Sequence, residues 1–281
     1  IEVKITFITV STPGIKNLIE AGKEINKNYP EILDLSIYYG KEELDDKKAK
    51  QMIEDIKNSH LVFVDLMGSP SSVVKNVYIG LQECNGNIIP YGSSAREYMR
   101  LGSFTMDSMK SQNKKMDMAA IEKMRNTAEM LGKIMPGKMR DMRNYSNIMK
   151  YFKVADKSNI LNMLYLMMRD YGNIKELPKP LEPREVEEAG ICNPENMRFY
   201  KNYEDYEKDF PFDDKKPIVA MLFYGHTYPT DTSSCIGQIK SRIEEFANVL
   251  PVAVSGTFAK NEEKLREIIL KSTKRSVDLM L

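Results

Sequence analysis

Short apolar runs alternate with longer amphipathic segments over the first 97 residues of this chain. Runs rich in β-branched and apolar residues are typical of strands that are buried on both faces of a sheet. Ser11, Thr12, Pro13 and Gly14 follow the first run, and Ser11 or Thr12 can cap the helix that begins near Ile15. The pattern predicts a parallel sheet covered by helices. Its strands are expected at residues 5–10, 33–39, 61–66 and 87–90, and its further helices at 41–57 and 71–84.

Residues 98–178 change character: strand patterns are absent, and most of the 19 methionines lie here. Apolar residues recur every three or four positions, which predicts helices. A methionine stripe can form an adaptable binding groove, but ordinary core against a neighbouring domain is the commoner reason for it and is our expectation. The first stripe comprises Ile121, Met124, Ala128, Leu131 and Met135, and the second comprises Ile160, Met163, Leu164, Met167 and Met168.

Strand and helix patterns resume in the last hundred residues, after a proline-rich connector at 177–183 that resembles a stiff linker. Strands are predicted at 218–223, 250–254 and 277–281, with helices between them, the first capped by Asp231 or Thr232. The predicted fold class is α/β, with two Rossmann- or flavodoxin-like parallel-sheet units joined by a methionine-rich helical region. The predicted divisions are an α/β domain at 1–97, a helical region at 98–178, and a linker with the first half of a second, truncated α/β domain at 179–281.

Charge and composition narrow the class of protein. Lys plus Arg total 41 against 40 for Asp plus Glu, so the net charge of +1 gives no field to recruit nucleic acid or an anionic membrane. No apolar stretch reaches the roughly 18–20 residues that a membrane span needs. Three widely separated cysteines, without a C-x-x-C pair, predict reduced thiols in a cytoplasmic protein. Because residue 1 is not methionine and the last residues resemble a strand, we expect a piece of a longer protein.

Stand-alone catalytic motifs are absent from the sequence. It has no phosphate-binding G-x-x-x-x-G-K-[ST] motif, so we expect no ATP hydrolysis by this chain. The glycine pattern of dinucleotide-binding folds, the H-E-x-x-H motif and the G-x-S-x-G motif are also missing. With only His60 and His226, a zinc site of the common type would lack ligands.

The two histidines lead to different predictions. His60 directly precedes an apolar strand, and we interpret it as a hydrogen-bonded strand-end residue. His226 follows the strand at 218–223, where open α/β sheets bind their ligands, and imidazole can donate, accept or bind metal near neutral pH. With its neighbours Tyr224 and Thr227 it forms a candidate substrate-binding site. The alternative, a loop histidine that caps backbone groups, stays open.

Residues 217–256 carry a family resemblance. An apolar strand ends in Phe223-Tyr224-Gly225-His226, a long helix follows, and a second strand contains Leu250-Pro251-Val252. Weaker matches to the same family lie at 156–164 and 189–206. There this chain departs from the family pattern, with Ala155-Asp156-Lys157 in place of a pair of glycines and Cys192 or Asn193 in place of a histidine. This arrangement resembles the large, tetrapyrrole-binding subunit of the cobaltochelatase and magnesium chelatase family. The short opening strand and the Tyr224-x-His226 ending resemble its cobalt branch more closely.

The resemblance implies the amino-terminal part of an ATP-dependent ligase that inserts cobalt or magnesium into a tetrapyrrole, in the biosynthesis of cobalamin or chlorophyll-type cofactors. ATP would be hydrolysed by partner ATPase subunits. The fragment itself would bind no cofactor, and the catalytic residues are expected beyond Leu281, so that it is inactive alone. Two alternatives are a two-domain module that binds small ligands, with a hinge near 177–183, and a scaffold whose methionine-rich helices dock a partner.

Overall fold

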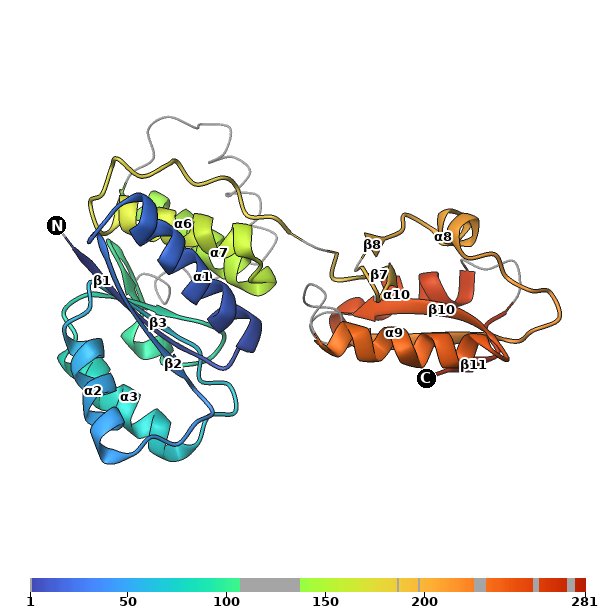
Figure 1. Ribbon diagram of the computed structural model, residues 1–281, viewed down its shortest axis with the longest axis horizontal. Helices are drawn as coiled ribbons and strands as arrows, with labels where there is room; N and C mark the ends of the chain where they lie inside the picture. The colour runs from blue at the N-terminus through green and yellow to red at the C-terminus, as the bar shows by residue number, and fades with distance from the viewer. Residues whose placement is uncertain are drawn as a thin grey trace. The chain divides into compact units, whose positions relative to one another are not determined.

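A computed structural model describes residues 2–106, 137–185, 187–196, 198–224, 231–254, 258–271 and 276–281. They form two compact units, residues 1–184 and 185–281 (Figure 1). The predicted helix at 121–135, and the first methionine stripe with it, lies outside the described residues.

The first unit is built on a six-stranded sheet of order β2-β1-β3-β4-β5-β6. Its first four strands run parallel, with β1 between β2 and β3, while β5 and β6 form a short antiparallel edge. The predicted strands at 33–39 and 87–90 are confirmed. The strands are β1 (Val3–Thr9), β2 (Leu33–Tyr39), β3 (Leu61–Val64), β4 (Asn87–Pro90), β5 (Arg100–Leu101) and β6 (Phe104–Thr105).

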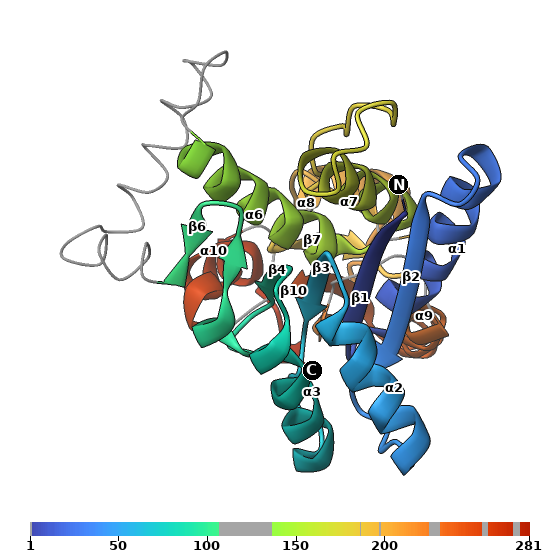
Figure 2. The same ribbon diagram turned by 90° about the vertical axis from the view of Figure 1, so that its left-hand side faces the viewer.

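Helices cover both faces of this sheet, which explains why its central strands are apolar on both sides. Ile5 and Phe7 of β1 pack against α1, α6 and α7, whereas Ile8 packs with the residues of α2 and α3. Figure 1 shows these two layers of helices, and Figure 2 shows β6 beside α6. The helices are α1 (Thr12–Asn28), α2 (Asp46–Lys57), α3 (Ser71–Glu83), α6 (Gly137–Val154) and α7 (Lys157–Asp170), with a 3-10 turn at Arg96–Tyr98.

Side-chain caps decide where the helices begin. The Ser11 hydroxyl accepts a hydrogen bond from the Gly14 amide at 3.1 Å and caps α1. Of the two predicted caps, Ser11 or Thr12, the cap is Ser11, and the helix begins at Thr12 rather than near Ile15. Asp45 caps α2 through the Lys48 amide, so this helix begins at Asp46 and the prediction of a start at residue 41 is wrong. An acceptor side chain at the helix start overrides the charge pattern that precedes it.

The second methionine stripe belongs to the core. Met163, Met167 and Met168 of α7 are completely buried against the first sheet, together with Phe7 and Phe63. In this helix the methionines fill core space rather than line an exposed groove.

The proline-rich connector is held against α6 and α7. The Tyr151 hydroxyl donates to the Leu181 carbonyl, and the Leu181 amide donates to Asn162 at 2.8 Å. Asn159 exchanges two hydrogen bonds with the backbone of Arg184, whose guanidinium lies 2.8 Å from Asp156. This segment is therefore fixed within the first unit up to Arg184.

A five-stranded sheet of order β11-β9-β10-β7-β8 forms the second unit. β9, β10 and β11 run parallel, whereas β7 is antiparallel to both β10 and β8. The helices after β9 and β10 lie on opposite faces, because α9 packs in one apolar cluster and α10 in the other. The elements are β7 (Ala189–Asn193), β8 (Arg198–Phe199), α8 (Tyr203–Asp209), β9 (Ile218–Tyr224), α9 (Asp231–Glu244), β10 (Asn248–Val254), α10 (Phe258–Lys271) and β11 (Leu279–Met280).

The predicted fold class, α/β with mostly parallel sheets, is confirmed, and so is the β-α-β-α-β order of the second unit. The sequence pattern did not predict the antiparallel strands at the edges of the two sheets. β5 and β6 interrupt a region expected to lack strands, and β7 and β8 lie between the proline-rich connector and the strand predicted at 218–223, where no strand was predicted. Three of these four strands have only two residues, too few to show a two-residue alternation.

Candidate functional site

The predicted site lies at the carboxyl edge of the second sheet. Tyr224 ends β9 and pairs with Val254, which ends β10. Because the following helices leave to opposite faces, this edge is a topological switch point, where open α/β sheets bind ligands. Tyr224 is 66% exposed. His226 and Thr227 lie outside the described residues, and the structure places only Tyr224 of the three candidates.

Elsewhere in this unit, buried polar side chains make packing contacts between α8, α9 and β10. The ammonium of Lys240, whose side chain is 3% exposed, lies 2.5 Å from Glu244 and 4.5 Å from the centre of the Phe210 ring. Tyr206 stacks on Phe210 and donates a hydrogen bond to the Val249 carbonyl at 3.3 Å. Burial raises the pKa of the Tyr206 phenol above its ordinary value, so it stays neutral. These contacts join α8, α9 and β10 into a rigid support.

The first sheet has its own switch point between β1 and β3, since β1 has β2 on one side and β3 on the other. Asp65, 3% exposed, follows β3 and accepts hydrogen bonds from Thr9 Oγ1 at 3.0 Å and from the Val10 amide at 3.3 Å. No cation lies within ion-pair distance of it among the described residues. The Ser69 hydroxyl nearby is buried without a hydrogen-bond partner there. Asp65 was not among the residues that the sequence patterns singled out, although an acidic residue directly after an apolar strand is a usable signal.

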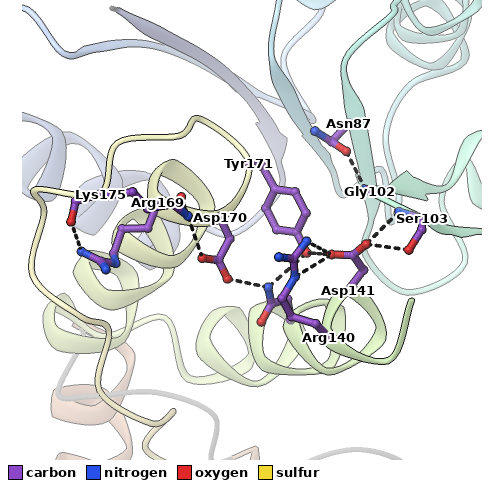
Figure 3. Close-up of polar contacts among 10 residues, drawn as sticks. Asn87, Gly102, Ser103, Arg140, Asp141, Arg169, Asp170, Tyr171 and Lys175 are labelled. Carbon is purple, nitrogen blue, oxygen red and sulfur yellow. Dashed lines mark hydrogen bonds and ion pairs between the residues drawn. The ribbon is translucent and has the colours of Figure 1, made fainter. Parts of the chain in front are cut away.

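The amino edge of the first sheet carries a polar network around Asp141 of α6, which is 1% exposed (Figure 3). Its Oδ2 accepts from the amide and the hydroxyl of Ser103, at 2.7 and 2.9 Å, and its Oδ1 accepts from the Tyr171 hydroxyl at 3.0 Å and from Arg140. Burial alone would raise the pKa of Asp141, but these hydrogen bonds outweigh it and hold the pKa below its usual value.

The Asp141 carboxylate is thus saturated by protein donors. It connects α6, the turn between β5 and β6, and the end of α7, which is a structural role. Gly102 makes this approach possible, because a Cβ there would stand 2.3 Å from Asp141 Oδ2. The interpretation of His60 as a strand-end residue is also confirmed, since its Nδ1 accepts from the Lys4 amide at 3.0 Å.

The described part of the chain contains neither a metal-binding cluster nor a membrane-spanning helix. No group of three His, Cys, Asp or Glu side chains there could hold a metal ion. No helix among these residues has the length and apolar composition to cross a bilayer.

Comparison with known proteins links part of the chain to one family. Residues 149–281 match the family model described as CobN/Magnesium Chelatase. No curated protein matches the chain. Among solved structures, the catalytic subunit of cobaltochelatase from Mycobacterium tuberculosis aligns over 91% of this chain, with 8% identity and a TM-score of 0.37. This chain spans 16% of the length of that subunit.

Proposed function

We propose that this chain is the amino-terminal part of the large subunit of an ATP-dependent metal chelatase, because residues 149–281 match the family model described as CobN/Magnesium Chelatase. The whole enzyme inserts cobalt, or alternatively magnesium, into a tetrapyrrole in cofactor biosynthesis, and partner subunits hydrolyse the ATP. The observation that carries this proposal is the family match, which includes α7, the connector and the whole second unit.

The carboxyl edge of the second sheet is the tetrapyrrole-facing part of this fragment. Support comes from the switch point between β9 and β10 and from the exposed Tyr224 at its rim. His226 and Thr227, which follow Tyr224 in the sequence, complete the proposed site. Their role is to hold the ring by hydrogen bonds to its polar substituents.

Metal insertion needs chemistry that this fragment does not provide. Two pyrrole protons must leave the ring, and the metal ion must lose its water, steps that a general base near the ring assists. That base belongs to another part of the enzyme in our proposal, and the isolated fragment neither hydrolyses ATP nor inserts metal. Cobalt is the proposed metal, on the strength of the Tyr224-x-His226 ending.

The decisive experiment is a tetrapyrrole titration of the full-length protein and its His226→Ala variant, followed by absorbance or fluorescence quenching. Loss of one hydrogen bond to a charged ring substituent costs about 1.5–3 kcal/mol, so affinity should fall about ten-fold or more. His60→Ala is the matched control, because His60 is exposed in the first unit and bonds only at a strand end. Equal affinities and equal thermal stabilities for wild type and His226→Ala would refute the role of His226. A wild type that binds no tetrapyrrole would refute the chelatase assignment itself.

A further inference from the structure

A pocket of about 530 Å³ opens in the second unit on the face that α10 covers. Its floor is the first half of β7, where Ala189, Gly190 and Ile191 are buried. Phe199 and Ile268 contribute apolar side chains to its lining. This volume lies within the range of small-molecule sites, about 300–1,000 Å³.

Two of the three floor residues, Ala189 and Gly190, are small. Ala189 and Gly190 project little or nothing from the strand, and the Phe199 ring lies so close that a Cβ on Gly190 would be 3.0 Å from its Cδ1. Tyr200 also lines the pocket, but its hydroxyl is engaged with Asp209 at 2.9 Å. The interior is therefore apolar, and a bound molecule must place an apolar body there.

The rim carries two lysines, two glutamates and Asn202. Lys264 of α10 bonds to Glu187 at 2.6 Å, which uses one of the three protons of its ammonium. Lys201 also lines the pocket and has no ion-pair partner among the described residues. Asn202 spends its side-chain oxygen on capping α8 through the Asp205 amide, which leaves its two N–H groups as donors. Glu267 is the remaining acidic residue at the rim.

We propose that this pocket binds an amphipathic anion, a molecule with an apolar body and a single carboxylate or similar head group. The apolar body packs on the floor between Phe199 and Ile268. The head group accepts hydrogen bonds from Lys201, with Lys264 and Asn202 beside it. This site is separate from Tyr224 and does not depend on the chelatase assignment.

The test is calorimetric titration of the chain with 2-naphthoate, a flat carboxylate, with decanoate, a flexible one, and with the uncharged 2-naphthamide. Both carboxylates can satisfy the charge requirement, and their relative affinities show whether the body is flat or flexible. We expect saturable binding of at least one carboxylate, one molecule per chain, and about five-fold or more weaker binding of the amide.

Variants that change a charge test whether the pocket binds its ligand as an anion. Lys201→Glu should weaken carboxylate binding about five-fold or more, whereas Lys215→Glu, the same change at an exposed lysine outside the pocket, should not. Glu187→Gln should strengthen binding, because it releases Lys264. Ile268→Trp should abolish binding by filling the pocket, and unchanged circular dichroism would show that it folds.

Four results would each overturn the proposal. They are absence of saturable binding, equal affinity for the carboxylate and the amide, no effect of Lys201→Glu, and loss of binding in Phe246→Ala. Phe246 lines a shallower groove on α9, so the last result would place the ligand there instead.

Discussion

Replacing Gly102 by alanine tests the Asp141 network at its closest contact. Gly102 has φ = +57°, and an added Cβ would stand 2.3 Å from Oδ2 and 2.6 Å from Cγ of Asp141. Gly92→Ala is the matched control: Gly92 has φ = +66°, and its Cβ would meet nothing within 4 Å. Both substitutions impose the left-handed backbone penalty of about 1–2 kcal/mol, but only Gly102→Ala displaces the carboxylate.

The size of the destabilisation by Gly102→Ala follows from the hydrogen bonds to Asp141 that would be lost. Oδ2 accepts from the amide and the hydroxyl of Ser103, and each hydrogen bond to a charged group contributes about 1.5–3 kcal/mol. With partial relaxation, we expect Gly102→Ala to lower the free energy of unfolding by about 3–5 kcal/mol, against about 1–2 kcal/mol for Gly92→Ala. Urea unfolding followed by circular dichroism measures both values. Hydrogen exchange of peptides from α6 assigns the transition to the first unit.

A double variant separates the contact from the backbone strain. In the Asp141→Ala background no carboxylate remains to be displaced, so the cost of Gly102→Ala should fall to that of Gly92→Ala. Equal costs for the two glycine substitutions in the wild-type background would refute this reasoning. So would a Gly102→Ala cost that is unchanged by Asp141→Ala.

Three further predictions concern buried charge and thiols. Lys240→Met should change the free energy of unfolding by less than about 1 kcal/mol. Glu244→Ala should lower it by about 3 kcal/mol, because the Lys240 ammonium is then buried and unpaired. Urea unfolding measures both values. Because the pKa of Asp141 is depressed in the folded state, it contributes stability above the unfolded pKa, near 4, which is lost as pH falls through the folded pKa. Asp141→Asn should therefore flatten the acid limb of a stability–pH curve. Iodoacetamide at pH 8 should label Cys235 rapidly in the native chain, because this cysteine is exposed. Cys84 and Cys192 should react only after unfolding, because burial raises the pKa of both thiols. Fast labelling of all three cysteines in the native chain would contradict this prediction.

Local sequence determined the parallel cores of both units. β2 was predicted with its observed bounds from the alternation of apolar and polar residues, and β4 from a short run that is mostly apolar and buried. A cap needs only an acceptor a few residues before the amide it bonds, and Ser11, one of the two predicted caps, is the cap of α1. The end of a strand is also a local feature: the strand predicted at 218–223 is β9, which ends one residue later, at Tyr224.

Tertiary structure decided the features whose partners are distant in sequence. Asp141 meets Ser103 across 38 residues and Tyr171 across 30, and Asp65 meets Thr9 across 56. The pocket likewise needs β7 and α10 side by side, with Glu187 and Lys264 77 residues apart. Periodicity reports which face of an element is buried, but not which element buries it. The two-residue edge strands and the donors around a buried carboxylate exist only once the chain has folded, because their partners are set by packing rather than by neighbours in the sequence.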